Sequence, residues 1–476
     1  MSNTTPPTET PFARQIFANR TLNLRSIRAI GYDMDYTLVH YRFRIWEERA
    51  YARLQELLVA DGWPVDHLRF DHDSVIRGLI VDSELGNLVK ANRFGYVMRA
   101  AHGTRMMDFL EQRDVYRHTP VQLSDPRFIF LNTLFSLSET CLYSQLVDLF
   151  DEGRLPGVNG YEDLFRKVRA RMDETHVEGT LKAEITADPA RFIDLDPDAA
   201  LALLDQKRAG KRLMLISNAE WEYAREIMTF AFDPFLGPGE TWRDLFELVI
   251  VGARKPAFFS QQLPIFKVVD EAEGLLAPVP GPIPGPGIYL GGDATKIEQY
   301  LGLSGSQILY VGDHVFADVR MSKASLRWRT ALILRELEEE LLAIEEISDV
   351  EEELSRLMAE KEDLEQRHCS ARLELQRRSQ NYSAQSARPT AEIQSDLDGL
   401  WSQMEGIDKQ VGPLAKQSAE AFSSRWGTPL RSGYDISHLA RQVERSADIY
   451  TSRVSNFLYA TPFAYLRAKR GSMPHD

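Results

Sequence analysis

Cysteine is scarce in this chain, since only Cys141 and Cys369 occur among its 476 residues. Both lie in segments with helical spacing, so we expect two buried, reduced thiols and a cytoplasmic location instead of a disulfide framework. No apolar run approaches the roughly 20 residues that a membrane-spanning helix requires, so no membrane association is expected. Residues 1–11 are polar and have neither a basic flank nor an apolar centre, which predicts a disordered lead-in and not a secretory signal.

An excess of basic charge is also missing. The chain has 56 Lys and Arg against 70 Asp and Glu, a formal net charge of -14 at pH 7. Nucleic-acid backbones are held mainly by clustered Lys and Arg, so broad binding to a nucleic-acid polymer is not expected. A small phosphate ester can still be bound by a few local cations. The length predicts two or three domains of ordinary size.

Four short apolar segments end in polar residues suited to phosphate chemistry. They are the segment that ends at Asp33, Lys211–Ile216 before Ser217 and Asn218, Leu248–Val251 before Lys255, and Ile308–Val311 before Asp313 and Asp318. Helical patterns separate them, which predicts an α/β fold with a doubly wound parallel sheet. Such sheets bind ligands at the carboxyl ends of their strands, so we expect these polar residues to meet there.

About 180 residues separate the first two of these segments, far more than one crossover helix requires. We expect a large α/β cap at residues 41–196, with helices at Glu47–Ala60 and Tyr161–Thr175 and turn-rich pieces around Gly78, Gly86 and Gly95. Such a cap would close the site against water. The catalytic core is expected at residues 1–40, 197–335 and 419–476. Within it, the Pro-rich piece Ala277–Gly287 should form a loop outside the sheet.

After an expected strand at Thr330–Leu334, apolar residues recur at intervals of three and four over two stretches that are joined by a polar linker, Ser379–Thr390. This spacing predicts an antiparallel helical hairpin at residues 336–418. The alternative is an intermolecular coiled coil, although the linker makes pairing within one chain easier. We also expect a homo-oligomer, either a dimer or a tetramer.

The hydrolysis of a phosphate monoester requires a nucleophile, a proton donor and cations around the phosphate. Asp33 is the candidate nucleophile, which would form an aspartyl-phosphate, and Asp35 is the candidate general acid and base. Asp33, Asp313 and Asp318, with the backbone carbonyl of Asp35, form an oxygen ligand set suited to Mg²⁺. Ser217, Asn218 and Lys255 are the candidate phosphate-binding residues. The alternative for the Asp and Ser residues is helix capping.

These residues resemble the four motifs of the haloacid dehalogenase (HAD) superfamily: Asp33-Met34-Asp35-Tyr36-Thr37-Leu38, Ser217-Asn218, Lys255, and Gly312-Asp313 with Asp318. Within this superfamily, the chain resembles the cytosolic purine 5′-nucleotidase family, the type that prefers IMP and GMP. The likeness extends from residues 17–20 to residues 473–476 and includes Arg77-Gly78-Leu79. Ala219 is a departure, since the family's second motif commonly reads Thr-Asn-Ser.

The resemblance implies a HAD-like core with a cap, and a Mg²⁺-dependent hydrolase that releases phosphate from purine nucleoside 5′-monophosphates and passes some of it to another nucleoside. It implies that Phe135 stacks on the purine, that Arg169, Asp173 and His176 hold the base and sugar, and that Lys182 contacts the phosphate. Two alternatives stay open: a HAD phosphatase acting on a non-nucleotide ester such as a sugar phosphate, and a catalytically silent scaffold that binds partners through the hairpin. The presence of both Asp33 and Asp35 argues against the scaffold.

Overall fold

A computed structural model of the chain describes residues 10–177, 179–382, 388–433 and 435–469, so most of the expected lead-in lies outside the described residues. The chain divides into two compact units. The first contains Met1–Glu338 and Pro429–Asp476, and the second contains Glu339–Thr428. Within the described ranges, no helix combines the length and the apolar character that a membrane span needs.

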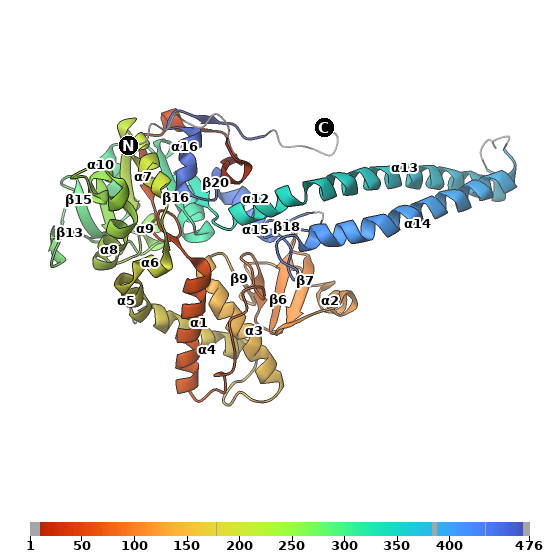
Figure 1. The fold of residues 1–476 in the computed structure, drawn as a ribbon, viewed down its shortest axis with the longest axis horizontal. Helices are drawn as coiled ribbons and strands as arrows, with labels where there is room; N and C mark the ends of the chain where they lie inside the picture. The colour runs from red at the N-terminus through yellow and green to blue at the C-terminus, as the bar shows by residue number, and fades with distance from the viewer. Residues whose placement is uncertain (1–9, 178, 383–387, 434, 470–476) are drawn as a thin grey trace. The chain divides into compact units, whose positions relative to one another are not determined.

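The first unit is built around one large sheet (Figure 1). In spatial order its strands are β1 (Phe17–Ala18), β20 (Ile449–Thr451), β17 (Arg329–Ile333), β16 (Ile308–Gly312), β3 (Ala29–Tyr32), β11 (Arg212–Ile216), β12 (Leu248–Val251), β15 (Gly287–Gly291), β13 (Ile265–Asp270) and β14 (Leu275–Pro278). The strands from β20 to β15 are parallel, while β1, β13 and β14 pair antiparallel. This arrangement confirms the predicted α/β fold class.

The central strands are buried on both faces, as expected for a parallel sheet that helices cover on both sides. On one face, α9 (Ala257–Ser260) and α10 (Ala294–Leu301) share an apolar core with the sheet. The other helices around the sheet are α7 (Pro197–Arg208), α8 (Trp221–Phe232), α11 (Met321–Leu326), α15 (His438–Ser446) and α16 (Phe457–Ala460). The strand order places β3 between β16 and β11, so the first motif lies in the middle of the sheet.

The expectation that Ala277–Gly287 stays outside the sheet is wrong at both ends of this piece. Ala277 and Pro278 belong to β14, and Gly287 begins β15. A proline is tolerated here because β14 is the last strand of the sheet, and an edge strand does not need every N–H for pairing.

Between β3 and β11 the chain forms a second sheet, which is antiparallel throughout. Its strands, in spatial order, are β8 (Arg105–Met106), β7 (Val97–His102), β6 (Asn87–Ala91), β5 (Ile80–Asp82) and β9 (Phe128–Phe130). The turn-rich pieces around Gly78, Gly86 and Gly95 are thus the turns of a sheet whose individual strands the sequence pattern did not locate. Its buried apolar residues pack against α2 (Phe109–Tyr116).

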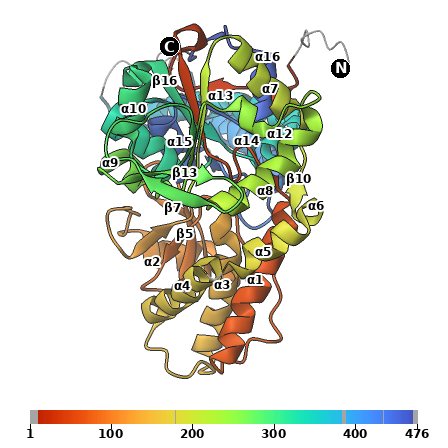
Figure 2. The ribbon, with the colours of Figure 1, turned by 90° about the vertical axis from the view of Figure 1, so that its left-hand side faces the viewer.

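Helices complete this inserted segment. They are α1 (Phe43–Ala60), α3 (Leu137–Asp151), α4 (Tyr161–Val177), α5 (Thr180–Ala187) and α6 (Pro189–Phe192), and α1, α3 and α4 lie side by side (Figure 2). Three two-stranded pairs tie segments together: β4 (His40–Tyr41) with β10 (Ile193–Asp194), β2 (Leu22–Asn23) with β21 (Tyr465–Leu466), and β18 (Arg431–Ser432) with β19 (Asp435–Ile436). The pairing of β4 with β10 joins the start of the insertion to its end.

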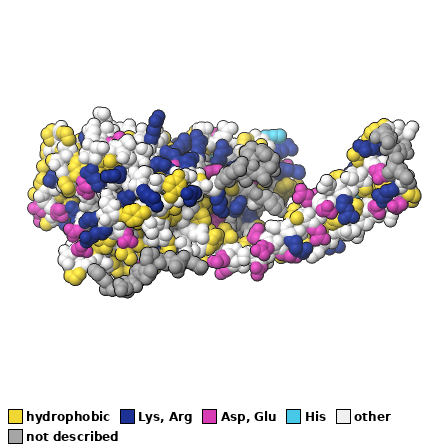
Figure 3. All heavy atoms as spheres, turned by 90° about the horizontal axis from the view of Figure 1, so that it is seen from above, with side chains coloured by type: hydrophobic (Ala, Val, Ile, Leu, Met, Phe, Trp, Pro, Cys, Tyr) yellow, Lys and Arg dark blue, Asp and Glu magenta, His cyan; other side chains and the backbone are white. Residues whose placement is uncertain are grey.

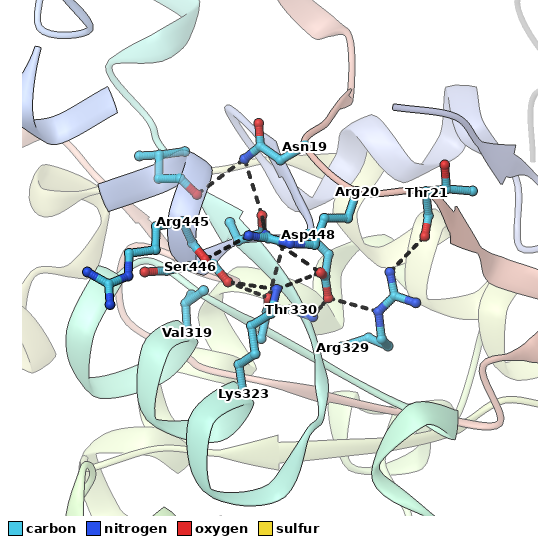
Figure 4. Close-up of polar contacts among 12 residues, drawn as sticks. Asn19, Arg20, Thr21, Val319, Lys323, Arg329, Thr330, Arg445, Ser446 and Asp448 are labelled. Carbon is cyan, nitrogen blue, oxygen red and sulfur yellow. Dashed lines mark hydrogen bonds and ion pairs between the residues drawn. The ribbon is translucent and has the colours of Figure 1, made fainter. Parts of the chain in front are cut away.

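A buried carboxylate fastens the last part of the chain to the sheet (Figure 4). Asp448, just before β20, accepts hydrogen bonds from Lys323 Nζ at 2.6 Å and Arg329 Nε at 2.8 Å. The backbone N–H of Thr330 donates to the same carboxylate at 3.0 Å. These contacts hold β20 beside β17, so the residues after the helical unit return to the same sheet.

The second unit is a helical hairpin of α13 (Ser348–Ser379) and α14 (Thr390–Glu420), which follow α12 (Leu337–Glu346). Leu357, Leu364, Leu400, Met404 and Ile407 form one buried cluster between the two long helices. Acidic and basic side chains alternate over the exposed surface of the hairpin (Figure 3), with ion pairs such as Arg356–Glu353. Cys141 is buried as expected, but Cys369 is exposed on α13.

Candidate active site

The carboxyl ends of β3, β12 and β16, which lie within four consecutive strands of the sheet, bring the predicted catalytic residues together. Asp33 follows β3, Lys255 follows β12, and Asp313 and Asp318 follow β16. The Lys255 Nζ lies 2.6 Å from Asp33 Oδ1 and 2.8 Å from Asp318 Oδ1. One carboxylate oxygen from each of Asp33, Asp313 and Asp318 lies within 4.8 Å of the others. The expectation that these four residues meet at one sheet edge is met.

Backbone contacts fix the loop that carries the first two aspartates. The N–H of Met34 donates to Asp33 Oδ1 at 2.8 Å, and the N–H groups of Leu38 and Val39 donate to the carbonyl oxygen of Met34. Tyr36 has a φ of 54°, a left-handed conformation that is rare for a residue with a bulky side chain. Such strain persists where the surrounding structure holds the loop firmly, and it occurs often at functional sites.

Asn218 joins the second motif to the third. Its side-chain oxygen accepts the N–H of Lys255 at 2.6 Å, and its side-chain nitrogen donates to the carbonyl oxygen of Lys255 at 3.2 Å. The predicted phosphate-binding residue Asn218 thus has its side chain engaged by the Lys255 backbone. Ser217 Oγ accepts the N–H of Ala219 at 3.0 Å, which is the local capping contact that was the alternative for this residue.

Gly312 allows Asp318 to approach the end of β16. A Cβ atom at this position would lie 2.6 Å from Cβ and Oδ2 of Asp318, closer than any real contact. A glycine is therefore required here for the Asp318 carboxylate to reach Lys255. The glycine of the Gly312-Asp313 pair was part of the sequence motif, and the structure gives its physical reason.

Burial dominates the electrostatics of the cluster. It raises the pKa of Asp33 to about 7, although the nearby Lys255 charge opposes the shift. Burial, Asp318 and Asp33 together raise the pKa of Asp313 well above its ordinary value. Burial alone would lower the pKa of Lys255, but the charges of Asp318 and Asp33 outweigh it and hold the pKa well above its ordinary value. Lys255 therefore remains a cation.

The donor set fits a divalent cation. Asp33, Asp313 and Asp318 are all buried, and they supply three carboxylates against the single positive charge of Lys255. Carboxylate oxygens are the ligands that Mg²⁺ prefers, and Mg²⁺ needs few protein ligands because it keeps several waters. The excess negative charge in a buried site is the physical reason why a cation would be accepted there. The expected backbone contribution of Asp35 stays a prediction.

Asp35 lies beside a pair of tyrosines. The Tyr41 hydroxyl donates to Asp35 Oδ1 at 2.5 Å and lies 2.9 Å from the hydroxyl of Tyr223. Burial raises the pKa of Asp35, while the hydrogen bond from Tyr41 and the charge of Lys182 oppose the shift. Lys182 Nζ lies 5.5 Å from the centre of the Tyr223 ring. The predicted phosphate contact Lys182 therefore lies on the Asp35 side of the site.

Arg77 is a site residue to which the sequence analysis gave no role. Its guanidinium is buried and donates to the backbone carbonyl oxygens of Asp313 at 2.6 Å and Asn132 at 3.0 Å. It also pairs with Glu336 at 3.0 Å. Arg77 thus links the inserted segment to the loop that carries Asp313. The sequence pointed to Arg77 only through the segment Arg77-Gly78-Leu79, which is one of those that resemble the purine 5′-nucleotidase family.

The predicted substrate-binding residues are placed only in part. The side chains of Phe135 and His176 lie outside the described part of the structure. Arg169 Nη1 lies 2.5 Å from Oε2 of Glu139, a buried carboxylate on α3. Asp173 is exposed, and its charge raises the pKa of Glu139, although burial is the larger cause. The structure thus brings Arg169 and Asp173 together around Glu139, which the sequence analysis had not singled out.

Comparisons with known proteins show which sequences this chain is similar to. The profile described as the 5′ nucleotidase family matches residues 16–476. The chain is 24% identical over 472 residues to a 5′-nucleotidase domain-containing protein of Dictyostelium discoideum, covering 97% of this chain and 75% of that protein. It is 27% identical over 478 residues to 5′-nucleotidase domain-containing protein 2 of Rattus norvegicus, and this match covers 97% of this chain and 80% of that protein.

Among solved structures, the chain is similar to an archaeal β-phosphoglucomutase from Pyrococcus sp. strain ST 04. The match has a TM-score of 0.32 and 10% sequence identity, and it covers 65% of this chain and 87% of that one.

Proposed function

This chain belongs to the 5′-nucleotidase family, and on that premise we propose that it hydrolyses purine nucleoside 5′-monophosphates to nucleoside and phosphate through an aspartyl-phosphate. As a member of this family it is a phosphoric monoester hydrolase. The observation that carries the proposal is the position of Lys255, whose ammonium group contacts the candidate nucleophile Asp33 and also Asp318. This contact places a fixed cation beside the carboxylate that must approach a dianionic phosphate.

In the first step of the proposed reaction, a carboxylate oxygen of Asp33 bonds to phosphorus while the bond from phosphorus to the 5′ oxygen breaks. Asp35 gives its proton to that departing oxygen, so the nucleoside leaves as a neutral alcohol. Lys255 offsets negative charge on the phosphate and orients Asp33. Asp33, Asp313 and Asp318 would hold Mg²⁺, which supplies further charge neutralisation when it is bound.

In the second step, water attacks the aspartyl-phosphate and Asp35 takes a proton from it. Phosphate leaves, and both aspartates return to their starting state. A nucleoside hydroxyl that replaces the water would receive the phosphoryl group instead, which is the proposed phosphotransferase activity. The family resemblance supports this branch and the roles of Phe135, Arg169, Asp173, His176 and Lys182 in holding the nucleotide. The roles of Ser217 and Asn218 at the phosphate, the cytoplasmic location and the homo-oligomeric state stay predictions.

The test is phosphate release from a panel of nucleoside 5′-monophosphates and sugar phosphates, with and without Mg²⁺. We expect purine nucleotides to be cleaved with the highest kcat/KM, and only when Mg²⁺ is present. Asp33→Asn should abolish the release. Sugar phosphates as the better substrates would favour the non-nucleotide alternative, and full activity of Asp33→Asn would overturn the mechanism.

A further inference from the structure

The hydroxyl groups of Tyr41 and Tyr223 form a short chain that ends on Asp35. The distances are 2.5 Å from Tyr41 Oη to Asp35 Oδ1 and 2.9 Å from Tyr41 Oη to Tyr223 Oη. Tyr41 comes from β4 and Tyr223 from α8, and both side chains are buried. Neither residue belongs to the four motifs that identified the site.

The direction of each hydrogen bond follows from the chemistry of the groups. An ionised carboxylate accepts hydrogen bonds and cannot donate, so the Tyr41 hydroxyl donates to Asp35 Oδ1. That proton is then committed, so the hydroxyl of Tyr223 must donate to the oxygen of Tyr41. When the carboxyl group of Asp35 takes up a proton, Oδ1 is already occupied by a donor, and Oδ2 is the oxygen that remains to carry it.

Packing holds the first tyrosine in this position. The ring of Tyr41 lies 5.2 Å from the ring of Tyr36 and 5.0 Å from that of Trp46. Tyr41 is also paired through its backbone with Ile193 of β10. A side chain that packs against two aromatic rings and is paired through its backbone keeps its hydroxyl in one place, which is what the orientation of a catalytic group requires.

We propose that Tyr41, supported by Tyr223, is the positioning residue of the general acid: it fixes the carboxyl group of Asp35 so that Oδ2 carries the proton to the departing oxygen. The inference rests on the proposed function, because it assigns a role in the same reaction. The step balances, since the proton on Oδ2 moves to the 5′ oxygen as its bond to phosphorus breaks, and Asp35 is left as a carboxylate. Tyr41 itself gains and loses no proton.

The experiment compares two substrates that differ in their need for a proton. A nucleoside 5′-monophosphate releases a poor leaving group that must be protonated, whereas p-nitrophenyl phosphate releases a phenolate that is stable without a proton. The measured quantity is kcat/KM, which includes the departure of the leaving group. For Tyr41→Phe in the full chain with Mg²⁺, we expect kcat/KM for the nucleotide to fall about 10- to 100-fold, part of the usual contribution of a general acid. For p-nitrophenyl phosphate we expect a change of less than about threefold.

Three further variants make the result specific. Tyr223→Phe should lower kcat/KM less than Tyr41→Phe does, and again more for the nucleotide than for p-nitrophenyl phosphate. It provides the test if Tyr41→Phe does not fold. Tyr116→Phe is the matched control, because its hydroxyl also donates to a buried carboxylate, Asp82, at 2.8 Å, but this pair joins α2 to the antiparallel sheet. It should not change the ratio between the two substrates. In the background of Asp35→Asn, Tyr41→Phe should cause no further loss.

An equal loss on both substrates, or a full additional loss in the Asp35→Asn background, would overturn the role of Tyr41 and leave the proposed function intact. A wild-type protein that cleaves neither substrate would overturn the proposed function and this inference together.

Discussion

Buried charges in this protein are stabilised by partners from distant parts of the chain, and Asp448 is the clearest case outside the active site (Figure 4). Burial alone would raise the pKa of Asp448, but the hydrogen bonds from Lys323 and Arg329 outweigh it and hold the pKa below its ordinary value. The folded protein therefore protonates Asp448 at a lower pH than the unfolded chain does. The contribution of Asp448 to stability is complete when the pH is above the ordinary pKa of an aspartate in the unfolded chain. It is lost as the pH falls through the lower pKa that Asp448 has in the folded protein.

We predict that Asp448→Asn lowers the free energy of unfolding at pH 7 by about 3 kcal/mol, because it leaves two half-buried cations without their anion. The difference from wild type should shrink as the pH falls below about 4. Urea unfolding of the wild type and of Asp448→Asn over a series of pH values measures this difference in the free energy of unfolding. Asp198→Asn is the control, since the Asp198 side chain is 50% exposed and lies 3.8 Å from Arg14, so the variant should show a small difference at every pH. A difference that stays constant with pH would contradict this assignment.

The sequence predicted the residues whose position follows directly from a strand. Asp33, Lys255 and Asp313 each follow a strand end, and parallel strands deliver such residues to one edge. The contacts of Tyr41, Arg77 and Glu139 could not be predicted in this way. Arg77 meets a residue 236 positions away, and Tyr41 meets one 182 positions away. Only the folded arrangement of the inserted segment creates these pairs.

Among the elements, apolar runs and helical spacing predicted the parallel strands β3, β11, β12, β16 and β17 and the two long helices, but not the parallel strands β15 and β20. Leu248–Val251 was predicted with the bounds that the structure shows for β12. The cap was predicted to be α/β, but the strands of its antiparallel sheet were not located, because they are short and several of their buried residues are polar, such as Asp82, Asn87 and Lys90. A polar residue in a strand hides the alternation that identifies it. The extent of the cap and core domains stays a prediction.

The hairpin offers a test at the level of elements. Leu364 on α13 lies in the buried cluster with Leu400 and Met404 of α14. We predict that Leu364→Ala lowers the stability of the helical unit by about 2 to 3 kcal/mol, because it removes buried methyl groups and leaves a cavity. Leu373→Ala on the same helix is the matched control, since Leu373 is 41% exposed and should change stability by less than about 0.5 kcal/mol.

Denaturant unfolding followed by circular dichroism measures both variants, because the two long helices contribute strongly to the helical signal. Equal effects of Leu364→Ala and Leu373→Ala would contradict the packing between α13 and α14. If the hairpin formed only between two chains, the effect of Leu364→Ala would change with protein concentration, which is the outcome that the alternative coiled coil predicts.

For the molecule as a whole, folding brings three carboxylates and one lysine into a buried site with excess negative charge. A cation that binds only the folded protein should therefore stabilise it. We predict that Mg²⁺ raises the thermal unfolding midpoint, with a stabilisation of about 2.7 kcal/mol at a concentration 100 times the Kd. Asp313→Asn should reduce this shift sharply.

Asp82→Asn is the control for the Mg²⁺ shift, because Asp82 is a buried carboxylate that pairs with Arg127 away from the cluster. It should lower the midpoint without Mg²⁺ but keep the shift. A wild-type midpoint that does not respond to Mg²⁺, or an unchanged shift in Asp313→Asn, would contradict the metal assignment.

The central claim is that Asp33 becomes phosphorylated during turnover. The most direct measurement is to mix the protein with a purine nucleoside 5′-monophosphate and Mg²⁺, quench with acid during turnover, and locate the added phosphoryl group by mass spectrometry. The account predicts one phosphoryl group on Asp33, and none in Asp33→Asn. A phosphoryl group on another residue, or turnover that continues undiminished in Asp33→Asn, would contradict it.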